Sequence, residues 1–97
     1  MGKPEGIVEK YLAKQAKSHG FLCWKFESSS QNGVPDRVLI GHGRNIYVET
    51  KSPVGKLRDQ QEIIIDIMRK HGAEVYVINT KELVDKFFEK LRKDLKL

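Results

Sequence analysis

Apolar positions recur at two different spacings along the 97-residue chain, and these spacings predict where helices and strands lie. Three segments carry apolar residues every three or four positions, which is typical of helices that bury one face. Four shorter segments are rich in β-branched and aromatic residues and are bounded by glycine or polar residues, as strands are. The predicted order is a helix over 4–19, strands over 21–26, 37–40 and 45–51, a helix over 58–71, a strand over 74–78, and a helix over 80–91.

Capping residues support the predicted helix boundaries. Pro4 suits the first turn of a helix, Gly20 and Gly72 stand where helices end, and Thr80 is a suitable N-cap. The step from the third strand through the second helix to the fourth strand is long enough for a parallel crossover. We therefore expect one α/β domain over residues 1–97, a small mixed sheet flanked by helices in the order α-β-β-β-α-β-α.

The apolar pattern also predicts which side chains are buried. The aromatic residues of the first strand, Trp24 included, are expected in the core rather than as platforms for stacked bases. In the helix over 58–71, the inward residues are expected to be Ile64, Ile67 and Met68.

Phe87 and Phe88 are adjacent in the last helix and cannot both face one narrow apolar stripe. We therefore expect this helix to bury a second face in another subunit, which predicts a homodimer.

Composition places the chain among globular domains, with 39% hydrophobic and 32% charged residues. No apolar run is long enough to span a bilayer, and the first residues do not resemble a secretory signal, so we expect a cytoplasmic protein with no membrane partner. The single cysteine, Cys23, excludes an internal disulfide and a zinc site built on paired cysteines. The net charge of +5 agrees with a polyanionic partner but also with solvated helix surfaces.

The two middle strands bring charged residues together. If His42 and Gly43 form a two-residue hairpin loop, the register places Asp36 directly opposite Glu49. Two carboxylates at that separation repel each other unless a cation lies between them or one is protonated. Lys51 projects from the same face of the strand as Glu49, because side chains alternate.

A structural explanation of these residues is also available. A Glu-x-Lys triplet arises by chance in lysine-rich chains, and Asp36 follows Pro35 as residues at a strand entry often do. His19 and His71 lie near helix ends, where a cationic ring interacts favourably with the helix dipole, so they are not needed as metal ligands.

The motifs together resemble a known family. Gly33-x-Pro35-Asp36, then Glu49-x-Lys51, then Gln61 on the helix that ends at Gly72, are similar to the VRR-NUC domain of the PD-(D/E)XK superfamily. The resemblance extends from Glu9 to Ile78. It implies a restriction-endonuclease-like α-β-β-β-α-β core, here followed by a C-terminal helix. It also implies a divalent-metal-dependent DNA nuclease, like the stand-alone phage members that act on branched DNA or four-way junctions as homodimers.

The resemblance assigns roles to six residues. Lys51 would be the catalytic lysine, and Gln61 would support the active site, although Gln60 is adjacent and the assignment could shift by one position. The ligands of Mg²⁺, for which Mn²⁺ would substitute, would be Asp36, Glu49, the Thr50 backbone carbonyl and, through water, Glu9. No small-molecule cofactor is expected.

DNA contacts are expected from Arg37, Ser30 and Lys56. The loop over 28–33 is either a substrate-sensing or subunit-crossing element or simply a connection between strands. The competing interpretation of the whole chain is a non-catalytic nucleic-acid-binding module on the same fold. The carboxylates argue against it, because they repel phosphate and would only weaken a pure binder.

Overall fold

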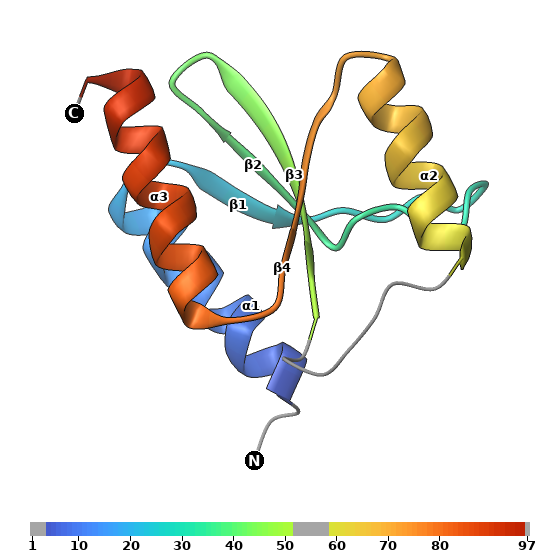
Figure 1. Ribbon diagram of the computed structural model, residues 1–97, viewed down its shortest axis with the longest axis horizontal. Coiled ribbons are helices and arrows are strands. Elements are labelled where there is room, and N and C mark those ends of the chain that lie inside the picture. The colour runs from blue at the N-terminus through green and yellow to red at the C-terminus, as the bar shows by residue number, and fades with distance from the viewer. Residues whose placement is uncertain (1–3, 52–58, 97) are drawn as a thin grey trace.

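The computed structural model describes residues 4–51 and 59–96, and these form three helices and one four-stranded sheet (Figure 1). The helices and strands follow the predicted order, which confirms the predicted fold class. The elements are α1 (Pro4–Ser18), β1 (Leu22–Lys25), β2 (Arg37–Gly41), β3 (Arg44–Thr50), α2 (Asp59–Lys70), β4 (Glu74–Ile78) and α3 (Lys81–Leu95).

The sheet is mixed, with the strands in sequence order. β1 pairs with β2 and β2 with β3 in antiparallel fashion, whereas β3 and β4 are parallel. The parallel pair is joined by α2, as predicted from the length of the connection. His42 and Gly43 both have positive φ, of 51° and 75°, as a tight two-residue hairpin turn requires. The turn sets Gly41 opposite Arg44, so the predicted register is confirmed.

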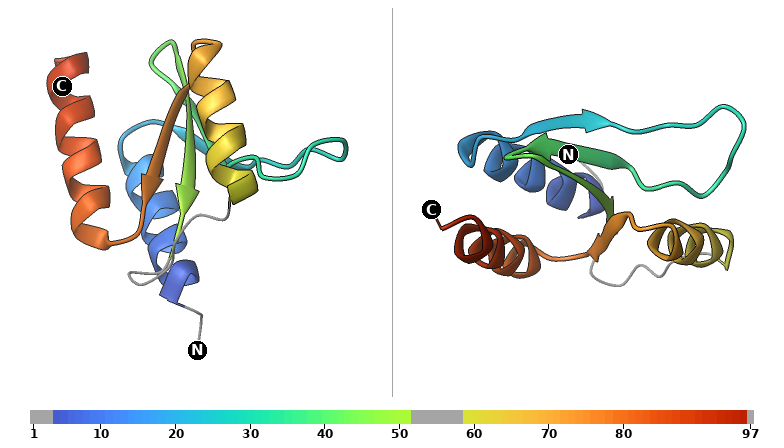
Figure 2. Two further views of the ribbon diagram at one scale, coloured as in Figure 1. Left: turned by 45° about the vertical axis from the view of Figure 1, so that its right-hand side comes forward. Right: turned by 90° about the horizontal axis from the view of Figure 1, so that it is seen from above.

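The two faces of the sheet are covered differently. α1 and α3 pack on one face, and α2 lies on the other face beside β4 (Figure 2). Every second residue of the sheet points into the core beneath α1 and α3, as side-chain alternation requires. This core contains Val8, Leu12, Ala16, Phe21, Leu39, Ile46, Val48, Ile78, Val84, Phe87, Phe88 and Leu91.

The helix ends follow the predicted caps. The Thr80 hydroxyl accepts a hydrogen bond of 3.1 Å from the Leu83 backbone N–H, which satisfies one of the free donors at the start of α3. Gly20 and Gly72 have φ of 82° and 93° just after α1 and α2, the left-handed conformation that favours glycine.

Three predictions about burial are wrong. Trp24 is 58% exposed, because it lies on the edge strand β1 and points to the face that α2 covers only near β4. Ile67 is 46% exposed, because the buried stripe of α2 includes Ile64 and Ile65 instead. Phe87 and Phe88 are both buried within their own chain, where Phe87 packs on Tyr76 and Phe88 on His19.

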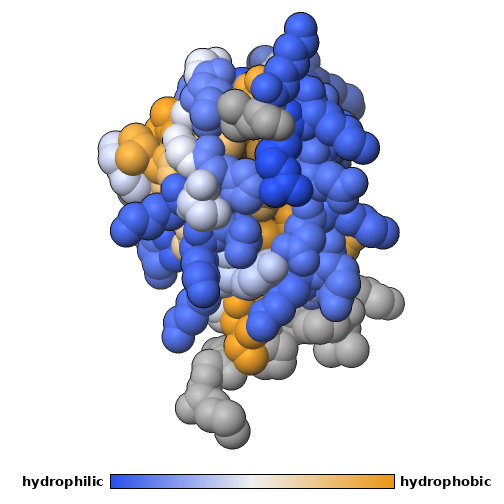
Figure 3. Space-filling view, turned by 90° about the vertical axis from the view of Figure 1, so that its left-hand side faces the viewer, coloured by the Kyte–Doolittle hydropathy of each residue, from blue (hydrophilic) through white to orange (hydrophobic). Residues whose placement is uncertain are grey.

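The reason given above for a dimer through α3 therefore fails. Seen from the side on which α3 lies, the molecule presents a mainly hydrophilic surface with small apolar areas (Figure 3). None of the described helices is long and apolar enough to cross a bilayer.

Candidate active site

Five of the predicted site residues meet around the end of β3: Asp36, Glu49, Thr50, Lys51 and Gln61. Three elements contribute: Glu49, Thr50 and Lys51 lie at the end of β3, Gln61 lies in the first turn of α2, and Asp36 directly precedes β2. The β2–β3 ladder ends at the Arg37–Val48 pair, one residue short of the predicted Asp36–Glu49 pair. The backbone N–H of Phe26 donates to the Asp36 carbonyl over 2.8 Å, and this bond holds the backbone at Asp36 beside the sheet.

Glu49 is the most deeply buried carboxylate of the site, with 2% of its surface exposed. Its Oε2 accepts a hydrogen bond of 3.0 Å from the Gln61 side-chain amide and lies 3.1 Å from the Lys51 ammonium. Its Oε1 is buried and has no hydrogen-bond partner among the described residues. A buried carboxylate oxygen without a partner is costly, so this atom is poised to accept a ligand that it lacks here.

The charges around Glu49 favour a cation. Burial raises the pKa of the Glu49 carboxyl, and the negative charge of Asp36 raises it further. The Lys51 ammonium lowers this pKa, but the net shift is upward. Burial and the neighbouring Asp36 carboxylate thus both disfavour the charged form of Glu49, and a bound divalent ion would favour it.

Asp36 is oriented by Thr50. The Asp36 Oδ2 atom accepts hydrogen bonds from the Thr50 backbone N–H over 3.1 Å and from the Thr50 hydroxyl over 3.0 Å. Thr50 is itself buried, with 3% exposed. The sequence pointed to Thr50 for its carbonyl and missed its hydroxyl. A threonine between two charged residues at the end of an apolar strand was the available signal.

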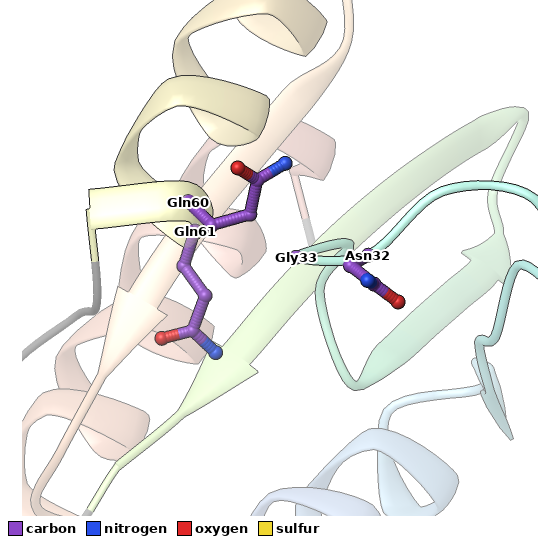
Figure 4. A pocket seen from close by; sticks show the side chains of 4 residues that line it. All are labelled: Asn32, Gly33, Gln60 and Gln61. Carbon is purple, nitrogen blue, oxygen red and sulfur yellow. The ribbon is translucent and has the colours of Figure 1, made fainter.

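The two neighbouring glutamines have different positions. Gln61 contacts Glu49, whereas Gln60 is exposed and reaches toward the loop at Gly33 (Figure 4). The ambiguity left by the sequence is thereby resolved in favour of Gln61 as the residue that holds Glu49.

Glu9 and Arg37 bind each other. The Arg37 Nε atom donates to Glu9 Oε2 over 2.7 Å, and both side chains are largely buried. Arg37 lies on the same face of β2 as Leu39, beneath α1, so it points away from Glu49. For Arg37 to contact DNA, or for Glu9 to contact the water shell of a metal, this ion pair has to rearrange. This ion pair was not predicted from the sequence, because its partners are 28 positions apart.

Two further residues, Ser30 and Lys56, were predicted to contact DNA. Ser30 is exposed on the loop between β1 and β2 (residues 26–36), and Lys56 lies outside the described residues. The histidines have structural roles: His19 and His71 each place Nδ1 within hydrogen-bond distance of a carbonyl one turn back, at 2.7 and 2.9 Å.

The donor set suits magnesium better than zinc. Within the described residues, no group of three or more His, Cys, Asp and Glu side chains could hold a metal ion. Mg²⁺ is usually bound by one or two protein carboxylates, with water and substrate phosphate completing its octahedron. Asp36 and Glu49, whose Oε1 has no partner in the described part of the chain, match that requirement.

Comparison with known proteins identifies the family. The family model of the VRR-NUC domain matches residues 4–82. The chain belongs to the VRR-NUC family. This confirms the family predicted from the motifs, and with it the class of the domain, a nuclease.

Two individual relatives agree with the VRR-NUC assignment. "Putative nuclease p44" of Acyrthosiphon pisum secondary endosymbiont phage 1 is 33% identical over 86 residues, covering 81% of this chain and 86% of the phage protein. A solved structure described as "VRR_NUC domain" is 30% identical, with a TM-score of 0.84, covering 91% of this chain and 97% of the other. α3 lies almost entirely beyond the matched residues 4–82, although it supplies part of the core.

Proposed function

We propose that this chain is a divalent-metal-dependent endonuclease that hydrolyses phosphodiester bonds in DNA. The observation that carries the proposal is the Glu49 carboxylate, buried beside Asp36. One of its oxygens is held by Gln61 and Lys51, and the other has no partner among residues 4–51 and 59–96. A carboxylate kept in this state lowers stability and is explained by a ligand that binds there. The VRR-NUC match and the nuclease name of the phage relative support the same conclusion.

Each residue of the site has a distinct part in the proposed reaction. Asp36 and Glu49 would hold Mg²⁺, or Mn²⁺ in its place, and the Thr50 carbonyl would be a third ligand. A bound divalent ion supplies Lewis-acid activation of the phosphate and of the attacking water. Thr50 orients Asp36 through two hydrogen bonds, and Gln61 holds Oε2 of Glu49, which would leave Oε1 available to the ion.

Lys51 acts on the substrate rather than on the fold. Its ammonium lies beside Glu49, where it can orient the attacking water and offset the negative charge that develops on the phosphate in the transition state. Its side chain is 16% exposed, so solvent screens this charge only weakly.

The decisive measurement is Mn²⁺ binding by calorimetry together with cleavage of labelled single-stranded, duplex, flap and four-way-junction DNA. Cleavage should require Mg²⁺ or Mn²⁺ and disappear with EDTA. Asp36→Asn should lose both metal binding and cleavage, whereas Lys51→Ala should retain metal and DNA and lose turnover by two or more orders of magnitude. Lys70→Ala is the matched control, because Lys70 is exposed and forms an ion pair with Asp66 on its own helix.

Two results would overturn this assignment. Unchanged Mn²⁺ affinity in Asp36→Asn would show that the ion binds elsewhere. DNA binding without cleavage under every metal would favour the alternative, a non-catalytic nucleic-acid-binding module.

We further propose that the substrate is branched DNA and that the enzyme acts as a homodimer. Exposed apolar side chains occur at two places that a second copy could cover, Leu22 and Trp24 on β1 and Ile63 and Ile67 on α2. Two active sites related by a two-fold axis suit paired cuts in a four-way junction. Light scattering should show a mass of two chains, and lysine substitutions at β1 and at α2 should show which surface is the interface. A monomer that makes unpaired cuts would refute the dimer but not the nuclease.

A further inference from the structure

A pocket of about 390 Å³ lies between the β1–β2 loop and the start of α2 (Figure 4). Within the part of the chain that the structure describes, it is lined by Asn32, Gly33, Gln60 and Gln61, none of which is charged. Its volume falls at the lower end of the range typical of small-molecule sites. The pocket therefore has room for one small planar group rather than for a duplex.

The pocket shares Gln61 with the candidate active site. Gln61 lines it and also donates its side-chain amide to Glu49 Oε2 over 3.0 Å. A phosphate held at Asp36 and Glu49 would thus place the neighbouring nucleotide at this pocket.

Close packing of the backbone fixes the shape of the pocket. Gly33 has φ of 88°, and a Cβ atom there would lie 3.0 Å from the Gln60 carbonyl oxygen. The β1–β2 loop therefore packs tightly against α2 at this point. The side chain of Gln60 reaches toward the loop, whereas that of Gln61 points toward the sheet (Figure 4).

The chemistry of the pocket disfavours phosphate. The first turn of α2 carries Asp59 and Glu62, whose charges offset the usual preference of a helix N-terminus for anions. The lining amides are neutral and offer both hydrogen-bond donors and acceptors. Asn and Gln amides match the edges of nucleobases in this way.

We propose that the pocket binds the base of one unpaired nucleotide next to the scissile phosphate, with Asn32 and Gln60 hydrogen-bonding its edge. This inference rests on the proposed function. A base inside a duplex is stacked and its Watson–Crick edge is occupied, so it enters such a pocket only when it leaves the stack. Selectivity for branched DNA follows, because the cost of unstacking is lowest where a nucleotide is already unpaired.

The test uses flap DNA in which a single abasic nucleotide is moved one position at a time past the branch point. Binding is measured by fluorescence anisotropy in EDTA, and cleavage rates are measured in Mg²⁺. At one position, loss of the base should weaken binding by the native protein roughly three- to tenfold, as expected for one or two lost hydrogen bonds. The double variant Asn32→Ala, Gln60→Ala should bind intact DNA with that same loss and show no further loss at the abasic position.

Asn45→Ala is the matched control, because Asn45 is an exposed amide on β3 that does not line the pocket. It should keep the native dependence on the abasic position. An equal abasic penalty in the native protein and the double variant, or no penalty at any position, would overturn the proposal. Metal-dependent cleavage alongside that result would leave the nuclease intact. The expected binding pattern without any cleavage would instead support the pocket and refute the nuclease.

Discussion

At the scale of single residues, Glu49 lowers the stability of the fold while providing a ligand for the proposed metal ion. Its carboxylate is almost fully buried, lies near Asp36, and leaves Oε1 without a partner among the described residues. Each of these features disfavours the charged form that a metal ligand must adopt. The charged Glu49 should therefore lower the free energy of unfolding of the metal-free protein, and metal binding should raise it again.

Glu49→Gln should raise the stability of the metal-free protein at neutral pH by about 1 kcal/mol. The reason is that the pKa of Glu49 is raised in the folded state. A raised pKa contributes stability that is fully present below the unfolded pKa and is lost as pH rises through the folded pKa. Urea unfolding between about pH 4 and about pH 7 should show this loss in the native protein and a smaller one in the variant.

Glu62→Gln is the control for this experiment, because Glu62 lies exposed on the surface of α2. Added Mn²⁺ should raise the stability of the native protein and of Glu62→Gln but not that of Glu49→Gln. A lower stability of Glu49→Gln at neutral pH would show that the Lys51 and Gln61 contacts outweigh the burial of the charge.

Thr50→Val should weaken Mn²⁺ binding about tenfold, as loss of an outer-shell hydrogen bond to a metal ligand does. The substitution keeps the shape of the side chain and the backbone N–H bond but removes the hydroxyl that donates to Asp36. Thr50→Ser restores the hydroxyl and should recover affinity. Equal Mn²⁺ affinity in all three proteins would show that the backbone N–H alone orients Asp36.

The central residues of the candidate site were predictable, because their chemistry is local. Asp36, Glu49 and Lys51 follow from the hairpin register and strand alternation, and Gln61 from the motif order. The Glu9–Arg37 pair and the Thr50 hydroxyl bond were not predictable, because each depends on how separate elements pack in three dimensions.

At the scale of elements, the β1–β2 loop is shaped by one glycine. Gly33 combines positive φ with a close approach to α2, so a side chain there meets two penalties. Gly43 in the β2–β3 turn also has positive φ, of 75°, but has nothing within 4 Å of the position of its missing Cβ. Comparing substitutions at Gly33 and Gly43 therefore distinguishes the cost of the left-handed backbone from the cost of steric crowding.

Gly33→Ala and Gly43→Ala should each lose about 1 kcal/mol of stability from the left-handed backbone. Gly33→Ala should lose more, because the loop must also move away from Gln60. It should reduce DNA cleavage, whereas Gly43→Ala should cleave normally once folded. Thermal unfolding and cleavage rates measured on both variants would show this. Equal effects of the two substitutions would mean that the loop tolerates separation from α2.

The elements themselves were predictable from periodicity and caps, but the coverage of their faces was not. A strand pattern shows that two faces alternate, and it does not show that α2 covers β4 while leaving β1 open. Trp24 and Ile67 are exposed for that reason. Conversely, Phe87 and Phe88 are both buried because α3 packs against α1 and against β4. Phe87 contacts Tyr76, and Phe88 contacts His19 and Phe21.

At the scale of the whole molecule, the sheet separates stability from chemistry. The main core lies between the sheet, α1 and α3, whereas Glu49, Lys51 and Gln61 lie on the face that carries α2. α3 contributes Val84, Phe87, Phe88 and Leu91 to the core and no residue to the candidate site. Substitutions in the core should therefore lower stability and leave cleavage intact, whereas substitutions at the candidate site should lower cleavage without unfolding the protein.

Phe88→Ala should lower the free energy of unfolding by about 3–5 kcal/mol, the usual cost of removing a buried aromatic side chain. Phe88 is 2% exposed and packs between His19, Phe21 and Phe87. The cavity that the substitution leaves would therefore be closed to solvent. Leu83→Ala on the same helix should cost less than about 1 kcal/mol, because Leu83 is 40% exposed. Below its melting temperature, Phe88→Ala should still bind Mn²⁺ and cleave DNA at the native rate. A loss of metal affinity in the folded variant would show that packing beneath the sheet holds Asp36 and Glu49 in register, and that the two faces do not act independently.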